Sequence, residues 1–272
     1  MNRIQTLYNS IIGKKVIAAV TGLVLFGFLL GHVAGNLKVF TGSTEQGIPH
    51  IDEYGQFLKV AGEPLLPAGA LLWGARLVLI TSVILHITVV VQLAMLSAEA
   101  RPVAYVKSKK KAASLPALWM MFSGSLIAGF IVFHILHFTT GTIQIGEFEH
   151  GYVYNNLRSS FSNPFVAGGY IFVMLVIGIH LNHGVWSMFQ TLGIDNPDRN
   201  KFLRTASTAL TMAIVLGCMA PAASNFDSSA TRDDGSRHRR RPPPAPPPPP
   251  PPPPRRPPPP PPPRSAEPPA GH

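Results

Sequence analysis

The stretch VIAAVTGLVLFGFLLGHVAGNL, residues 16–37, carries no charged side chain and a single histidine, His32. As an α-helix rising about 1.5 Å per residue it spans about 33 Å, enough to cross a hydrocarbon core of about 30 Å. Four more segments share this apolar character, at 69–96, 116–138, 165–189 and 203–223. The sequence therefore predicts an all-α membrane protein built as a five-transmembrane-helix bundle.

The composition limits the kinds of site that this chain can form. The chain has 272 residues, of which 46% are hydrophobic and 13% charged, and Cys218 is its one cysteine. A single cysteine excludes a disulfide framework, and also an iron–sulfur or zinc site that this chain would build from thiolates alone. Of the net charge of +10, residues 227–272 contribute eight Arg against four acidic residues, which leaves +6 for the rest. No basic face interleaved with aromatic residues accompanies this charge, so we expect no nucleic-acid partner.

The basic residues gather at the N-terminus and in the second and fourth loops, whereas the first and third loops are richer in acids. By the positive-inside rule, these basic segments face the cytoplasm. We expect a multi-pass protein of the bacterial inner membrane, in contact with lipid, with its N-terminus cytoplasmic. The basic residues are Arg3, Lys14, Lys15, Arg101, Lys107, Lys109, Lys110, Lys111, Arg199, Lys201 and Arg204.

Residues 227–272 differ in kind from the membrane domain of residues 1–226. They hold 21 of the 29 prolines and have no apolar periodicity with which to build a core. Such a tail is expected to be disordered or extended as polyproline II. Its arginines would fall on the external side after five crossings, against the charge rule, so a frameshifted reading frame is an equal alternative to a genuine appendage.

Four consecutive apolar segments each contain a histidine: His32, His86, His134 and His180. Ionisable residues inside a bilayer are costly and usually mark a function. Counted along each helix, His32 and His134 lie about 24 and 27 Å from the inner edge, and His86 and His180 about 22 to 26 Å from the outer edge. The histidines therefore form two pairs at two levels of the membrane.

Two imidazoles at one level can ligate a haem iron from opposite faces of the porphyrin. Two such pairs predict two b haems and an electron path across the bilayer. Hydrogen bonds between helices, or a proton relay in a transporter, are the alternatives for these histidines. His137 and His183 lie one turn beyond His134 and His180, and are secondary ligand candidates.

Over about residues 1 to 220 the chain resembles the single-chain, five-helix, dihaem cytochrome b subunit of succinate:quinone oxidoreductases and fumarate reductases. The resemblance selects His180 over His183 as a ligand, and it selects His134 on the third helix. It pairs His32 with His134 on a distal haem and His86 with His180 on a proximal one. The matching segments are Thr21-Gly22 to His32 with Gly35-Asn36, Arg76 to His86, Gly124 to His134, and His180-Leu-Asn-His-Gly-Val-Trp-Ser-Met-Phe-Gln.

The resemblance implies a membrane-anchor, electron-transfer subunit that binds two haems b and passes electrons from succinate to a quinone, expected to be menaquinone. A cytoplasmic flavoprotein subunit and an iron–sulfur subunit would be its partners, and the dicarboxylate site would belong to them. Polar groups at the membrane edge would exchange protons with the quinone. Asp52, Glu53 and Glu63 are the candidates, with ordinary solvated loop acids as the alternative reading. Gly178 stands where some family members have a glutamate, which puts their transmembrane proton path in doubt here.

Three other functions remain alternatives. The cytochrome b subunit of a formate dehydrogenase, hydrogenase or nitrate reductase also binds two haems between membrane helices. A proton-coupled transporter would use membrane histidines too, and such proteins commonly have internal repeats. We find no clear repeat in this sequence. A purely structural anchor would bind no haem.

Overall fold

The computed structural model describes residues 3–100, 115–196 and 200–226. Within these ranges the chain is helical, and the only β-type pairing is an isolated bridge between Ser43 and Pro49. The predicted tail of residues 227–272 and the basic cluster from Lys107 to Lys111 lie outside the described residues.

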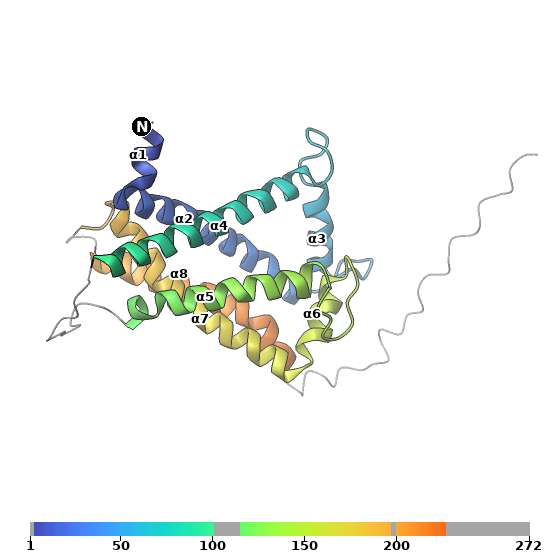
Figure 1. The fold of residues 1–272 in the computed structure, drawn as a ribbon. Helices are drawn as coiled ribbons and strands as arrows, with labels where there is room; N and C mark the ends of the chain where they lie inside the picture. Colours follow the sequence, from blue (N-terminus) through green and yellow to red (C-terminus); the bar gives the residue numbers. More distant parts are fainter. Residues whose placement is uncertain (1–2, 101–114, 197–199, 227–272) are drawn as a thin grey trace, which may run out of the picture. The chain divides into compact units, whose positions relative to one another are not determined.

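Five long helices account for the five predicted apolar segments. Each is long and apolar enough to cross a membrane, and together they indicate a multi-pass membrane protein. Successive long helices run in opposite directions (Figure 1). Their bounds are α2 (Ile11–Asn36), α4 (Ala70–Glu99), α5 (Leu115–His134), α7 (Pro164–Thr191) and α8 (Asn200–Phe226).

Short elements extend or connect these helices. A short helix, α1 (Arg3–Asn9), precedes α2. The 3₁₀ turn η1 (Leu37–Phe40) extends α2, and the π-helical turn η2 (Ile135–Thr139) extends α5. Helix α3 (His50–Val60) links α2 to α4, and α6 (Val153–Phe161) links α5 to α7. Helices α3 and α6 pack against each other at one end of the bundle (Figure 1).

Local sequence explains where the long helices begin. The Ser10 hydroxyl accepts a hydrogen bond from the backbone N–H of Gly13 at 2.9 Å, which caps α2 and separates it from α1. Asn163 caps α7 in the same way, and Pro164 occupies its first turn, where a missing N–H costs nothing. Gly69 precedes α4 with φ of 78°, a left-handed conformation that glycine adopts without strain.

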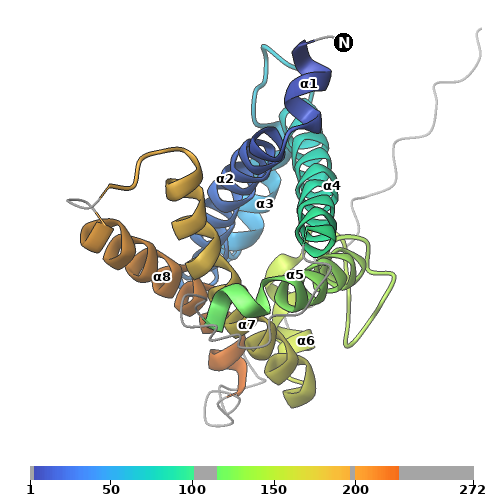
Figure 2. The ribbon, with the colours of Figure 1, turned by 60° about the vertical axis from the view of Figure 1, so that its left-hand side comes forward.

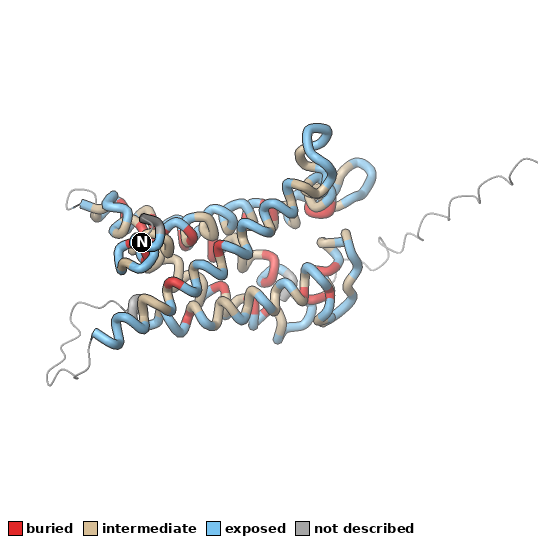
Figure 3. The backbone as a smooth tube through the Cα atoms, turned by 45° about the horizontal axis from the view of Figure 1, so that its top comes forward, coloured by how far each residue is buried: buried red, intermediate tan, exposed pale blue. Residues whose placement is uncertain are grey.

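Apolar side chains cover much of the outside of the bundle. Leu77 and Ile84 on α4 are about three-fifths exposed, and Phe172 on α7 is similarly open. The long helices appear mostly as exposed or half-buried tube, with buried residues scattered between them (Figure 3). A soluble protein rarely exposes so much contiguous apolar surface, whereas a lipid-facing helix does so everywhere.

The long helices pack as a line of neighbours in which α2 is central. Helix α4 lies along α2, α5 lies along α7, and α8 packs against both α7 and α2 (Figure 2). Two glycines bring α8 close: a Cβ added to Gly178 would lie 2.8 Å from Val215, and one added to Gly217 would lie 2.5 Å from Val33. Small residues at such contacts drive helix association in lipid. Among the described elements, no extended contact joins α4 to α5 or α7.

Two halves of the bundle repeat one order of elements, which the search for a sequence repeat did not find. A long helix, a short end turn, a short helix and a second long helix occur as α2–η1–α3–α4 and again as α5–η2–α6–α7. The first helices share a spaced pattern: Thr21-Gly22, Gly27-Phe28 and His32 in α2 match Ser123-Gly124, Gly129-Phe130 and His134 in α5. The match is short and lies within uniformly apolar sequence, which is why the sequence alone did not reveal it.

Candidate functional site

His32 and His134 form a ring pair between α2 and α5, the first helices of the two halves. Their ring centres are 5.9 Å apart and their planes are inclined at 85°. Two nitrogen–metal bonds of about 2 Å each, and about 1.1 Å from each bonded nitrogen to its ring centre, add to about 6 Å. The separation therefore equals what two imidazoles need to bind one metal ion from opposite sides.

We call His32 and His134 the outer pair and His86 and His180 the inner pair, after their two levels along the helices. The surroundings of the outer pair match between the halves. Phe28 lies one turn before His32, with ring centres 5.3 Å apart and planes at 32°, and Phe130 lies before His134 at 5.7 Å and 31°. Cβ atoms added to Gly27, Gly31 or Gly129 would meet nothing within 4 Å. No other described side chain therefore covers the helices at these three glycines.

One nitrogen of the outer pair is buried without a partner. Nδ1 of His134 makes no hydrogen bond and is shielded from solvent. An unsatisfied buried polar atom costs about 1 to 3 kcal/mol, so such atoms are rare unless a ligand or a water completes them. His134 therefore differs from His86, whose Nδ1 has a carbonyl acceptor.

His86 on α4 is held by the beginning of α2. Its Nδ1 lies 3.1 Å from the carbonyl oxygen of Ala18 and 3.2 Å from the hydroxyl of Thr21. A carbonyl only accepts, so Nδ1 carries the proton and donates. In a neutral imidazole the other nitrogen, Nε2, is then bare and able to bind a metal.

His180 on α7 is held in a corresponding way by α5. Its Nδ1 lies 3.1 Å from the Ser123 hydroxyl, which itself donates to the carbonyl of Met120. The two anchored rings also meet equivalent glycines: a Cβ on Gly22 would lie 3.4 Å from the His86 ring, and one on Gly124 would lie 3.4 Å from His180.

The two pairs lie at different levels of the bundle. Thr21 marks the level of His86 on α2, and His32 lies eleven residues further along the same helix. At about 1.5 Å per residue the levels are about 16 Å apart. Ser123 and His134 repeat this spacing on α5. The structure therefore brings the rings of His32 and His134 together. The pairing of His86 with His180, also expected from depth, stays a prediction.

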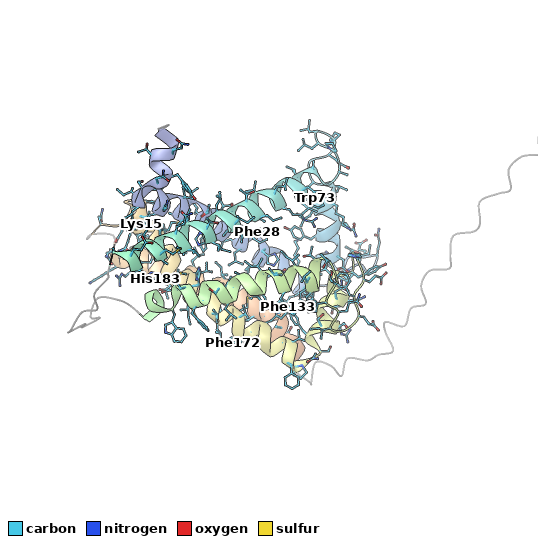
Figure 4. All side chains as sticks on the ribbon, in the orientation of Figure 1. Lys15, Phe28, Trp73, Phe133, Phe172 and His183 are labelled. Carbon is cyan, nitrogen blue, oxygen red and sulfur yellow. The ribbon has the colours of Figure 1, made fainter. Side chains whose placement is uncertain are left out.

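The secondary ligand candidates differ from each other. His137 is only 2% exposed, and both its nitrogens are engaged: Nδ1 with the Tyr170 hydroxyl at 2.9 Å and Nε2 with the Ser160 hydroxyl at 3.1 Å. It has no nitrogen left for a metal. His183 is half-buried, and it lies toward the same end of the bundle as Lys15, whereas Trp73 lies toward the other (Figure 4).

The three acidic candidates for a quinone site do not gather. Asp52 is buried, and its Oδ1 accepts a hydrogen bond from the backbone N–H of Tyr154 at 2.9 Å, which ties α3 to the start of α6. Burial raises the pKa of Asp52, opposed by the N–H groups of Tyr154 and Val153. Glu53 pairs with His50 at 3.1 Å on the surface, and Glu63 is exposed in the turn after α3.

The donors suit haem better than a bare metal ion. A haem iron takes only two axial ligands from the protein, and each histidine pair provides two. In the described part of the chain, no group of three or more His, Cys, Asp or Glu side chains could hold a metal ion. His32 and His134 would hold such a haem iron between their rings.

Several residues of this site were not singled out from the sequence. Ser123, Tyr170 and Ser160 are ordinary membrane-helix or loop residues by composition. The signal for Ser123 was the spacing it shares with Thr21, eleven residues before a histidine on the first helix of each half. Nothing in the sequence points to Tyr170, because its partner His137 approaches from another helix.

No family model, no curated protein and no solved structure matches this chain.

Proposed function

We propose that this chain is a dihaem cytochrome b, the membrane-anchor subunit of a succinate:quinone oxidoreductase. The observation that carries the proposal is the close approach of His32 and His134, with His86 and His180 each anchored at a second level about 16 Å away along the helices. The ring separation of the outer pair is close to the one that a shared metal ion requires, and Nε2 of His86 is bare.

A haem held at each pair would supply one-electron redox chemistry. His32 and His134 would hold the outer haem, and His86 and His180 would hold the inner one. The apolar helices around them exclude water, and Phe28 and Phe130 pack beside the outer ligands. Two haems in sequence provide a path for electrons between the two faces of the membrane.

The succinate assignment rests on the resemblance of the helix-four segment from His180 to Gln190 and on one ligand per helix. It implies a flavoprotein subunit and an iron–sulfur subunit docked on the cytoplasmic side, and a quinone, expected to be menaquinone, as the substrate in the membrane. Asp52 is the acid best placed for quinone proton exchange, since it is buried beside α6 and burial raises its pKa.

The experiment is a reduced-minus-oxidised spectrum of the purified complex, with the haem extracted and counted per chain. We expect b-type bands and two haems per chain, with flavoprotein and iron–sulfur subunits in the same preparation. Partner subunits of a formate dehydrogenase, hydrogenase or nitrate reductase would redirect the assignment within dihaem cytochromes. One haem per chain, or none, would refute the two-pair arrangement.

The internal repeat favours one second candidate, a proton-coupled transporter. Parallel repeats build several transporter folds, and membrane histidines can relay protons. A transporter would purify without colour and would acidify or alkalinise a vesicle lumen as its substrate moves. The haem count therefore separates the two functions directly.

A further inference from the structure

Each inner histidine meets a hydroxyl group that also lies against a carbonyl of its own helix. The Thr21 hydroxyl lies 2.7 Å from the carbonyl oxygen of Ile17, and the Ser123 hydroxyl lies 3.1 Å from that of Met120. The carbonyl of Ala18 makes Nδ1 of His86 a donor, which leaves Nε2 bare. The proposal below assigns the same tautomer to His180, with the single Ser123 proton on Met120 and the hydroxyl accepting from Nδ1.

Back-bonding to the helix is common for Ser and Thr in apolar helices and is not by itself a sign of function. Ser125 and Thr88 show this ordinary case, since their hydroxyls donate to Met121 and Ile84 and both side chains are exposed. Thr21 and Ser123 differ because they are buried, at 7% and 3% exposure, and each meets an imidazole from another helix.

We propose that Thr21 and Ser123 are equivalent positioning residues, which hold the inner imidazoles in one tautomer and one orientation and so set how strongly they donate to the iron. The proposal rests on the proposed dihaem function. An acceptor at Nδ1–H makes an imidazole a stronger electron donor, which favours ferric over ferrous iron. Removing the acceptor should therefore raise the midpoint potential of the inner haem.

His86 and His180 differ in the number of acceptors near Nδ1, so the two substitutions should differ in the size of their effect. His86 keeps the carbonyl of Ala18 at 3.1 Å when the Thr21 hydroxyl is removed. His180 has no acceptor other than Ser123 among the described residues. Ser123→Ala should therefore shift the potential of the inner haem more than Thr21→Val does.

His134 of the outer pair has no such hydroxyl anchor. Its Nδ1 has no hydrogen-bond partner among the described residues, and its ring contacts the rings of Phe130 on α5 and Phe138 on η2. Loss of either hydroxyl should leave the outer haem unchanged, so each variant protein contains its own internal reference.

The experiment is a potentiometric titration of the purified complex, followed by the haem α-band and by low-spin ferric electron paramagnetic resonance. Ser123→Ala should raise one midpoint potential and shift one low-spin signal, and Thr21→Val should do so less. Ser123→Thr and Thr21→Ser keep the hydroxyl and should resemble the wild type. Ser125→Ala, two residues from Ser123 on the same helix, is the matched control and should have no effect.

The possible results distinguish failure of this proposal from failure of the proposed dihaem function on which it rests. Wild-type protein without haem refutes the proposed function. Ser123→Ala protein with two haems, unchanged potentials and unchanged resonance signals refutes the positioning role alone. If Ser123→Ala loses one haem, restoration of that haem in Ser123→Thr supports the role, and equal loss in both variants refutes it. The affected signal is assigned to the inner pair if it persists in His134→Ala protein.

Discussion

His32 and His134 lie with their ring centres 5.9 Å apart, although they come from α2 and α5, which belong to different halves of the bundle. In the proposed function the two histidines share one haem iron, so loss of either should have the same effect. His32→Ala and His134→Ala should each lower the haem content from two to one per chain, and the double variant should also hold one. His150→Ala, in the loop between η2 and α6, is the control and should retain two. Additive loss in the double variant would contradict the pairing.

The inner ligand on α7 is expected to be His180 and not His183. Only His180 has its Nδ1 anchored, by Ser123 at 3.1 Å, so only its Nε2 is oriented. His180→Ala should lose the inner haem, whereas His183→Ala should keep both. Haem quantitation with spectra of the two proteins checks this, and the reverse result would reassign the ligand.

The His137 cluster is expected to stabilise the fold without holding a haem. Tyr170→Phe removes a buried hydroxyl from Nδ1 of His137 and should destabilise the protein by about 1 to 3 kcal/mol, the cost of an unsatisfied buried group. Both haems should remain. Thermal unfolding in detergent, read against the exposed control Tyr152→Phe, measures the loss. If the Tyr170→Phe protein folded fully but lost a haem, His137 would have to be a haem ligand.

Asp52 should make stability fall as pH rises just above the ordinary aspartate range. Burial raises its pKa, so over the interval between the unfolded and folded pKa values the folded chain binds more protons than the unfolded one. Stability then decreases with increasing pH across that interval and is level above it. Asp52→Asn can still accept from Tyr154 and should lack this decrease. Unfolding midpoints of both proteins from acidic to neutral pH test the sign, and parallel curves would contradict it.

The contact between α7 and α8 should tolerate no side chain at Gly178. An added Cβ would lie 2.8 Å from Val215, whose branched side chain has little rotamer freedom. Gly178→Ala should therefore destabilise the protein by about 1 to 3 kcal/mol, as overpacking does. Gly168→Ala on the same helix, where a Cβ meets nothing within 4 Å, is the matched control. Combining Gly178→Ala with Val215→Ala should restore stability, and failure to do so would locate the strain elsewhere.

The five-helix architecture could be predicted from the sequence almost in full. The predicted segments 16–37 and 69–96 correspond to α2 with the start of η1 and to α4, because an apolar run long enough to cross lipid has few alternatives to a helix. Helix α2 begins five residues before its predicted segment, after the Ser10 cap, and α4 ends three residues beyond its segment.

The candidate site could be predicted only in outline. The rise per residue placed His32 level with His134, and the structure brings these rings together. The sequence could not assign hydrogen-bond partners across helices. It therefore left His137 as a ligand candidate, whereas the structure engages both its nitrogens with Tyr170 and Ser160. It also did not predict that Asp52 on α3 accepts a hydrogen bond from the start of α6.

Composition and the length of the apolar runs decide the number of helices, their alternating direction and the depth of each histidine, since these depend on one segment at a time. Which side of each helix faces its neighbours depends on rotation about the helix axis, and helices that are apolar all round encode little preference for one side. Close packing at Gly178 and Gly217 settles that rotation. Only then do Thr21 and Ser123 meet the rings of His86 and His180.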